Sequence, residues 1–334
     1  MPAPRLHRRA ALLQIAAGAA AVTAATTFPG SVLAQGNWPE KPITLISPFG
    51  GAVDILARLI ANDLGRRLGQ NVIVDLKLGG SGTIGMAAVA RAQPDGYTIG
   101  MGTTTSLTSA PHLIKNPGYD VEKSFTYLGL IQTSRQVLTV SPKLGVDTLQ
   151  DFIALARAKP GTLNFGSSGV GNSIHLAVEQ FNAAAGIKAV HVPYKTGNET
   201  DAAMMAGDVQ YTVASLATSL PLIQAGRIKA LAVTGEGRDP ALPNVPNLTE
   251  SGLAARIPDQ LFGMVGPASM PAPVTAKLLK AVADMQADPA FQDAVRRGGG
   301  LPSLVHGESF RKLALADSQT WGDLIKRLGI TLNS

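Results

Sequence analysis

The feature that most restricts the fold of this chain is a repeated alternation of short apolar runs with amphipathic segments, which begins near Pro42. Short apolar runs bounded by turn residues are typical of buried strands, and apolar residues spaced three or four apart predict helices. Strands that alternate with helices form parallel sheets whose faces are covered by those helices. The sequence therefore predicts an α/β fold.

The alternation occurs in two blocks. In the first block we expect strands at 43–47, 72–76 and 97–101, and helices at 54–68 and 83–92. Asp54 is the expected N-cap of the first helix, and Gly69 ends it. In the second block we expect helices at 149–158, 172–185, 200–206 and 219–225, and strands at 163–166, 189–192, 209–213 and 228–233. A strand at 262–265 and three C-terminal helices complete the chain.

Two extended stretches, 128–140 and 261–265, are long enough to cross between the blocks. We therefore expect the second block to be inserted into the first, with the C-terminal helices returning to the first. The expected lobe 1 is 38–139 plus 262–334, and the expected lobe 2 is 140–261.

The N-terminal segment has the pattern of a signal peptide. Arg5, Arg8 and Arg9 precede a mildly apolar, Ala-rich stretch, and small residues at Val32 and Ala34 suit signal peptidase. We expect residues 1–34 to be removed after Ala34 and the mature chain to be periplasmic. The arginine pair favours twin-arginine translocation over the Sec route.

The composition excludes several classes of function. The chain has no cysteine, so lipid anchoring, disulfides and thiol nucleophiles are excluded. The net charge of +6 includes three arginines of the signal segment, and the remaining charges are scattered, so no nucleic-acid partner is expected. The five histidines show no metal-binding spacing, and no acid/base pair is evident. We therefore expect neither a metal nor a catalytic residue.

Four Gly-rich loops are predicted at the carboxyl ends of strands, where parallel sheets bind ligands. They are 49–51, 79–83, 102–106 and 166–173. Each exposes backbone N–H groups near a helix N-terminus, where about half a positive charge accumulates. Because the loops carry Ser and Thr but no Lys or Arg, they favour a carboxylate over a polyphosphate.

Two other interpretations of these loops are weaker. Gly80 to Gly85 matches G-x-G-x-x-G, but the position about 20 residues further on is Thr105 rather than an acid, so no dinucleotide cofactor is expected. The run at 166–169 resembles a nucleophile elbow, but Val170 breaks the motif. His175 and His191 are candidate bases for such a site, although core histidines are the simpler interpretation.

Several runs of sequence resemble the Bug family, the periplasmic receptors of tripartite tricarboxylate transporters. The runs are Lys41 to Ile46 with Pro48 and Phe49, 54–58, 94–98, 163–169, 191–195, 231–234, 241–246 and 250–252. The resemblance covers nearly the whole mature chain. It implies a type II periplasmic-binding-protein fold with a ligand cleft between two lobes. It also implies a carboxylate ligand, held partly through water by the first loop, and membrane permease subunits as partners of a monomeric receptor.

The loops and the resemblance together give a set of expected ligand-binding residues. They are Phe49, Gly50, Gly51, Gly82, Thr83, Thr104, Ser106, Arg135, Ser167, Ser168, Asn172, Tyr194 and Ala214. Ser168 and Thr104 are the expected hydrogen-bond donors. Arg135 either faces the cleft and pairs with a second carboxylate or points to solvent.

Departures from the family pattern concern the ligand. Gly50 follows Phe49 directly, so the first loop is about two residues shorter than usual and its water-mediated grip is in question. Ala214 stands where relatives often have an acid, and the expected site loops contain no Asp or Glu. An α-amino group would lack a partner there, so we expect an organic acid without an ammonium group.

Three functions fit this sequence. The first is a receptor that binds a carboxylate and passes it unchanged to a transporter. The second is an exported sensor that signals to a membrane partner, and the third is an exported enzyme on the same fold. The absence of catalytic groups favours a receptor, but the sequence specifies neither the carboxylate nor the membrane partner.

Overall fold

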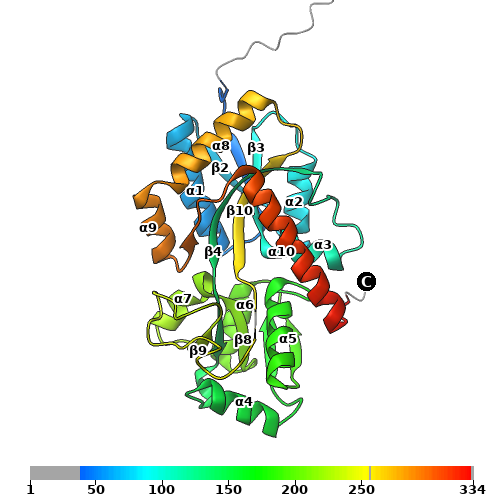
Figure 1. Cartoon of the computed structure of the whole chain (residues 1–334), viewed down its shortest axis with the longest axis vertical. Coiled ribbons are helices and arrows are strands. Elements are labelled where there is room, and N and C mark those ends of the chain that lie inside the picture. Colours follow the sequence, from blue (N-terminus) through cyan, green and yellow to red (C-terminus); the bar gives the residue numbers. More distant parts are fainter. Residues whose placement is uncertain (1–37, 256, 332–334) are drawn as a thin grey trace, which may run out of the picture. The chain divides into compact units, whose positions relative to one another are not determined.

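The computed structural model describes residues 38–255 and 257–331, and it contains two β-sheets (Figure 1). The expected signal peptide and its cleavage site lie outside these residues. Among the helices that the structure describes, none is long and apolar enough to cross a membrane.

The first sheet has six strands in the order β11-β4-β10-β3-β1-β2. Their bounds are Ile43–Ser47 (β1), Val72–Leu76 (β2), Thr98–Thr103 (β3), Phe125–Ser134 (β4), Gln260–Pro267 (β10) and Leu301–Pro302 (β11). Strand β1 pairs in parallel with β2 and β3, whereas β10 runs antiparallel to β3 and β4. The carboxyl ends of β1, β2 and β3 therefore meet at one edge.

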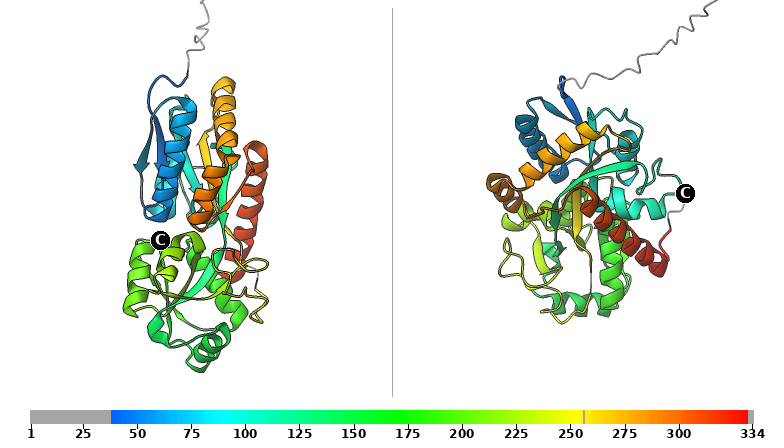
Figure 2. Two further views of the ribbon diagram at one scale, coloured as in Figure 1. Left: turned by 90° about the vertical axis from the view of Figure 1, so that its left-hand side faces the viewer. Right: turned by 45° about the horizontal axis from the view of Figure 1, so that its top comes forward.

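Helices cover both faces of the first sheet. Their bounds are Ala52–Leu68 (α1), Thr83–Ala90 (α2), Ala110–Leu113 (α3), Ala272–Gln286 (α8), Pro289–Arg297 (α9) and Gly307–Leu328 (α10), and short helical turns occur at Gly80–Gly82 (η1) and Thr104–Ser109 (η2). Helices α1 and α8 lie side by side (Figure 2). On the other face, Met86 and Val89 of α2 share a core with Phe310 of α10.

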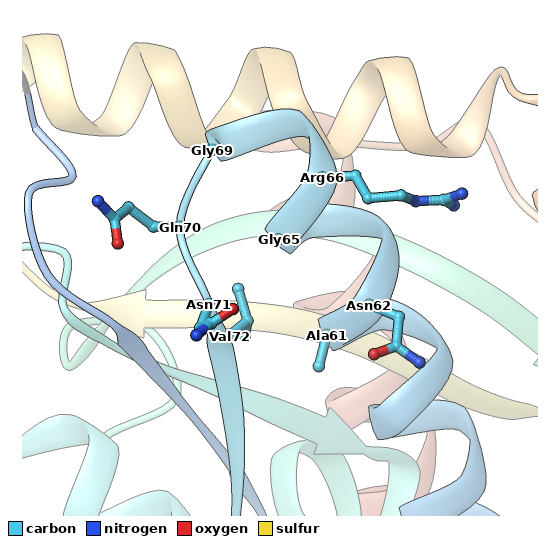
Figure 3. A pocket seen from close by; sticks show the side chains of 8 residues that line it. All are labelled: Ala61, Asn62, Gly65, Arg66, Gly69, Gln70, Asn71 and Val72. Carbon is cyan, nitrogen blue, oxygen red and sulfur yellow. The ribbon is translucent and has the colours of Figure 1, made fainter.

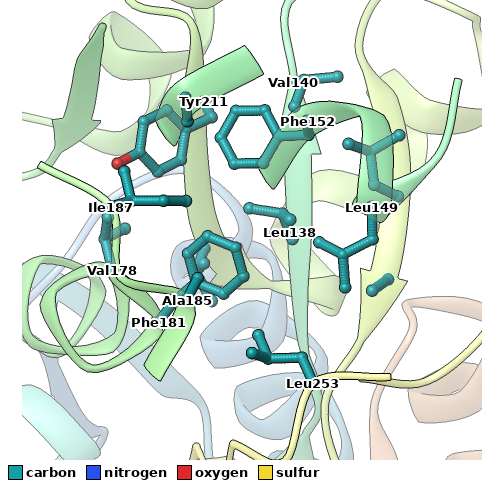
Figure 4. Packing of buried hydrophobic residues seen from close by; sticks show 14 of the residues in the cluster. Leu138, Val140, Leu149, Phe152, Val178, Phe181, Ala185, Ile187, Tyr211 and Leu253 are labelled. Carbon is teal, nitrogen blue, oxygen red and sulfur yellow. The ribbon is translucent and has the colours of Figure 1, made fainter. Parts of the chain in front are cut away.

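The second sheet has five strands in the order β7-β6-β8-β5-β9. The strands are Gln136–Val140 (β5), Asn164–Ser167 (β6), Val190–Pro193 (β7), Tyr211–Ser215 (β8) and Lys229–Val233 (β9). The helices are Leu149–Ala158 (α4), Ser173–Ala185 (α5), Gly197–Ala206 (α6) and Leu216–Gln224 (α7), with a 3-10 turn at Pro142–Leu144 (η3). Phe152, Phe181 and Tyr211 form an aromatic centre between this sheet and α4 and α5 (Figure 4). Such buried rings dominate core energetics.

The chain passes from one sheet to the other at Arg135. Strand β4 ends at Ser134 in the first sheet, and β5 begins at Gln136 in the second. All strands of the second sheet come from residues 136–233, and the chain returns to the first sheet at Gln260. Sheet membership therefore changes a few residues before the expected boundaries at 139/140 and 261/262.

One local expectation is wrong. Asp54 is not the N-cap of α1, because the helix begins at Ala52 after Gly51, whose φ of 67° turns the chain earlier. Asp54 lies in the first turn and pairs with Arg58 at 3.0 Å.

The C-terminal helices also reach beyond the first sheet. Trp321, Leu324 and Ile325 of α10 pack with Leu176 of α5, which belongs to the second sheet's layers. Helix α10 therefore contacts both halves of the chain.

Candidate functional site

The Gly-rich loops of the two sheets contact one another. The ring of Phe49 lies against Gly82, where an added Cβ would be 2.8 Å from Phe49 Cζ. On the side of the second sheet, a Cβ on Gly169 would lie 4.0 Å from Ser81 Oγ. The loops after β1, β2 and β6 therefore gather in one place, as their positions at the carboxyl ends of strands predict.

A second set of contacts joins the same edges through buried polar groups. Thr105 Oγ1 and Ser173 Oγ are 2.7 Å apart, and Ser173 Oγ donates to Gln260 Oε1 at 3.0 Å. The backbone N–H of Ser173 also donates to Thr105 Oγ1. All three residues are at most 6% exposed, so this network is a fixed support for the loops rather than part of a ligand surface.

Helix N-termini at these loops fall into two groups. Helices α1 and α2 begin after Gly51 and Gly82, and neither has a side-chain cap. By contrast, Asn172 caps α5 and Thr196 caps α6. Because the first N–H groups of a helix need acceptors, the starts of α1 and α2 offer backbone donors to an anion.

The loop before α2 has an unusual backbone. Residues 79–82 all have positive φ, including 53° at Ser81, one of two non-glycine residues with positive φ among the described residues. Such backbone costs of order 1 kcal/mol or more and occurs often at ligand sites. The hydroxyl of Thr83 donates to Gly80 O at 2.7 Å, so it fixes this loop instead of facing a ligand.

Thr104 and Ser106, two expected ligand residues, are completely buried. Thr104 Oγ1 accepts a hydrogen bond from Leu261 N at 2.7 Å, which ties the loop after β3 to β10. Ser106 Oγ accepts from Thr103 N at 3.0 Å within a capping box. The expectation that Thr104 donates to a ligand is therefore not supported, because its hydroxyl has a structural role.

Most polar side chains of the loop 166–173 bond within the protein, and one of them, Ser168, also lies at the surface. Ser167 is buried and donates to Gly169 O at 2.9 Å. Asn172 Oδ1 accepts from His175 N at 2.8 Å, and Asn172 Nδ2 donates to Ser168 Oγ at 2.7 Å. Ser168 is half-buried and uses its oxygen as an acceptor, so its hydroxyl proton can still be donated to an anion.

His175 and His191 form a stacked pair behind this loop. Their ring centroids are 3.9 Å apart with 12° between the planes. Burial lowers the pKa of His175 to about 4 and, together with its neighbour, that of His191 to about 3. Gly171 N donates to His175 Nδ1 at 3.0 Å, and His191 Nε2 lies 2.7 Å from Ser167 Oγ. The pair is neutral near pH 7, and the serine next to His191 is fully buried and donates its proton to Gly169 O, so its hydroxyl is not presented to a ligand.

Arg135 is held by protein groups and does not point to solvent. Its Nη1 and Nη2 donate to Gly237 O at 2.9 Å and to Glu236 O at 2.7 Å. Its Nε lies 3.9 Å from Asp239 Oδ2, and the side chain is only 16% exposed. The guanidinium therefore binds the segment after β9, at the point where the chain changes sheets.

The last two expected residues lie on neighbouring parts of the second sheet. Tyr194 follows β7, is half-buried and packs against the cluster of α6. Ala214 is buried in β8 opposite Val137.

Three residues near the loops were not among the expected ligand-binding residues. A Cβ on Gly51 would lie 3.3 Å from Asn198 Oδ1, so the first turn of α6 faces the start of α1. Asp201 lies one helical turn beyond Asn198, and burial raises its pKa to about 6. Ser81, described above, is the third. The loop after β7 lies at a strand carboxyl end like the other four, and that rule would have included Asn198.

A surface hollow lies away from the loop cluster. A cavity of 490 Å³ is lined by Asn62, Arg66, Gln70, Asn71 and their neighbours (Figure 3). It lies where α1 ends and β2 begins, which is the amino end of that strand. It therefore has no part in the loop cluster.

Comparison with known proteins gives the class of the molecule. Its structure matches R. palustris Rpa4515 with adipate at a TM-score of 0.84 and 31% identity, covering 88% of this chain and 99% of that one. It matches MatC (Rpa3494) from Rhodopseudomonas palustris with bound malate at 0.80 and 26%, covering 86% and 100%. The fold is thus that of the two-lobed periplasmic binding proteins.

The sequence gives the family. The family model described as tripartite tricarboxylate transporter family receptor matches residues 56–330, and the chain belongs to this family. Protein BugT of Bordetella pertussis is 27% identical over 92% of this chain and 95% of its own length. The resemblance to Bug receptors is confirmed, and the family is one of solute receptors rather than enzymes.

Proposed function

We propose that this receptor captures a small organic carboxylate against the N-termini of α1 and α2 and presents it to the membrane subunits of a tripartite transporter. One observation carries the proposal: both helices begin at glycines without a side-chain cap, Gly51 and Gly82, and Phe49 joins the two loops. Backbone N–H groups arranged this way bind anions without cationic side chains. The two structural relatives bind adipate and malate, which are small carboxylates.

The receptor acts as a monomer with two lobes. One lobe is residues 38–139 with 262–334, and the other is residues 140–261. The lobes approach one another at the loop cluster, with the sheet change at Arg135 as one connection. Ser81 and Gly169 mark the facing loops.

Isothermal titration calorimetry and thermal unfolding with a panel of mono-, di- and tricarboxylates test the function. A ligand that binds only the folded chain stabilises it by about 2.7 kcal/mol at a hundredfold excess over Kd. We expect such a ligand to be recovered unchanged after incubation. Chemical conversion above background would instead favour an exported enzyme.

Ser168→Ala should weaken carboxylate binding by about tenfold or more, because a hydrogen bond to a charged acceptor contributes about 1.5–3 kcal/mol. Its unfolding free energy should change little, since Ser168 is half-buried and its partner Asn172 keeps the cap on α5. Thr104→Val is the contrasting variant, because it leaves Leu261 N without its acceptor. It should cost about 1–3 kcal/mol of stability. Equal affinity in wild type and Ser168→Ala would place the carboxylate elsewhere.

Export is the second part of the proposal. We expect the mature chain to begin near Gln35, after cleavage behind Ala34, and to be found in the periplasmic fraction. Replacing Arg8 and Arg9 with Lys should block export if the twin-arginine route is used. Periplasmic protein in undiminished amount from that variant would indicate the Sec route, and cytoplasmic protein with an intact N-terminus would contradict export.

A further inference from the structure

Helix α10 joins the two halves of the chain, and one of its carboxyl groups lies close to that junction. The C-terminal half of α10 passes beside α5 (Figure 1), where the completely buried Trp321 packs with Leu176. Asp317 lies one helical turn before Trp321 and is half-buried. It forms no ion pair within the part of the chain that the structure describes. Its contacts therefore bear on how firmly α10 is held at the junction.

The contacts of Asp317 contain one proton too few when its carboxyl group is ionised. Thr108 of η2 is completely buried, and its Oγ1 lies 2.8 Å from Asp317 Oδ2 and also 2.8 Å from Thr104 O. A hydroxyl group carries one proton, so Thr108 can donate to only one of these two oxygens. The other oxygen would then lie at hydrogen-bond distance from Oγ1 with no proton between them.

A proton on Asp317 completes both contacts. The protonated carboxyl group donates to Thr108 Oγ1, and Thr108 donates its own proton to Thr104 O. Thr104 begins η2 directly after β3, within the Gly-rich loop 102–106. This chain of hydrogen bonds would therefore tie α10 to one of the site loops.

The surroundings of Asp317 favour the same proton. Burial raises the pKa of Asp317 to about 6, and the negative charge of Asp259 adds to the rise. The hydroxyl of Thr108 and the indole of Trp321 offset part of that rise. Arg135 is the cation near Asp259, whose pKa it lowers, but burial still leaves the pKa of Asp259 raised.

Other titratable groups lie on the elements that pack against α10, although η2 itself carries none. On α3, His112 Nε2 is 2.8 Å from Ser318 Oγ, and burial lowers the pKa of this histidine. On α5, His175 Nε2 is 3.7 Å from Glu179 Oε1, and burial lowers the pKa of His175 to about 4 and raises that of Glu179. The histidines gain charge as pH falls, so they act in the sense opposite to Asp317, whereas Glu179 acts in the same sense.

We propose that Asp317 binds a proton that holds the C-terminal half of α10 against η2, and that its ionisation loosens the contact of α10 with both halves of the chain. The inference goes beyond the proposed function, because it concerns the junction itself and its test needs no ligand. The proton stabilises this contact fully below the ordinary pKa of 3.8, and the stabilisation is lost as pH rises through about 6. A fall in the pH around the receptor therefore strengthens the junction.

Hydrogen exchange of the backbone amides of residues 318–325 tests the inference, after correction for the pH dependence of chemical exchange itself. In the wild type, the equilibrium constant for local opening should rise about tenfold between about pH 5 and about pH 7.5, since one pKa unit corresponds to a factor of ten. Asp317→Asn stays neutral and should show no such rise. Its opening should instead increase slightly towards low pH, where His112 gains charge.

Glu179→Gln is the matched control, because it removes a second carboxyl group with a raised pKa from an element that packs against α10. This variant should keep the wild-type slope. A wild type without a slope, or an Asp317→Asn protein with the wild-type slope, overturns the inference. Loss of the slope in Glu179→Gln alone would assign the proton to Glu179 and overturn it as well.

Asp259→Asn gives a second test that leaves Asp317 in place. Removing the neighbouring charge should lower the pKa of Asp317, so the midpoint of the pH profile should move to lower pH. Acrylamide quenching of Trp321 provides the measurement in a chain that also carries Trp38→Phe, since the sequence has two tryptophans. Quenching should increase with pH as α10 loosens and exposes the buried indole. A midpoint that Asp259→Asn leaves unmoved would show that the titrating group is not beside Asp259, which overturns the inference.

Discussion

Gly82→Ala should reduce carboxylate affinity by about a hundredfold. The added Cβ would lie 2.8 Å from Phe49 Cζ and 2.9 Å from Ser106 Cβ, at a φ of 84° that alanine adopts poorly. The positive φ costs about 1–2 kcal/mol, and overpacking typically costs about 1–3 kcal/mol more. The chain can relieve this strain only by moving the start of α2 or the Phe49 loop. Losing two charge-assisted contacts of about 1.5 kcal/mol each corresponds to the expected loss of affinity.

Gly69→Ala is the matched control for this prediction. Gly69 has a φ of 69° at the C-terminal end of α1, but nothing lies within 4 Å of its added Cβ. Gly69→Ala should therefore lower the unfolding free energy measured in urea by the cost of the positive φ alone. Its affinity for the carboxylate should stay unchanged. If calorimetry finds similar affinity for both variants, the N-terminus of α2 does not hold the anion.

The periodicity of the sequence predicted most of the fold because strand and helix patterns depend on neighbouring residues. The strands 43–47 and 72–76 and the helix 149–158 have the predicted bounds. The start of α1 was missed because Gly51 provides the turn without a side-chain cap, so Asp54 looked like the better boundary. The contact of α10 with Leu176 was missed because an amphipathic pattern does not say which layer it will cover.

The sequence predicted that the Gly-rich loops gather in one place, but not which hydroxyls would remain at the surface of that cluster. Thr104 and Ser168 look equivalent in the sequence, since both follow a strand in a loop rich in small polar residues. They differ because Thr104 meets Leu261, which is 157 residues away, whereas Ser168 is bonded to Asn172 within its own loop. Long-range partners of this kind decide whether a polar side chain supports a loop or faces a ligand, and they leave no local pattern.

The partners of Arg135 are also distant in the sequence and leave no local pattern. Replacing Arg135 gives the second large expected effect, which is on stability. The guanidinium sits near two acids: Asp239, which is 4% exposed, and Asp259, whose pKa is raised by burial and lowered again by Arg135. Arg135→Ala should therefore cost about 3 kcal/mol of unfolding free energy, as expected when one partner of a buried charge cluster is removed. Arg296→Ala, which breaks an exposed pair with Asp293, is the control and should cost about 0.5 kcal/mol.

The pH dependence and the affinity of Arg135→Ala distinguish a structural role from a ligand contact. Without the cation, the pKa of Asp259 should rise further, so the folded variant binds a proton more readily than the unfolded chain. The unfolding free energy of Arg135→Ala then falls as pH rises from the ordinary pKa of an aspartate to the raised pKa of Asp259. The difference in unfolding free energy between wild type and variant therefore shrinks as pH falls. Affinity for the carboxylate that binds the wild type should stay within about threefold, because the guanidinium already binds Glu236 O and Gly237 O. A stable variant that has lost carboxylate affinity would instead place Arg135 in the ligand site.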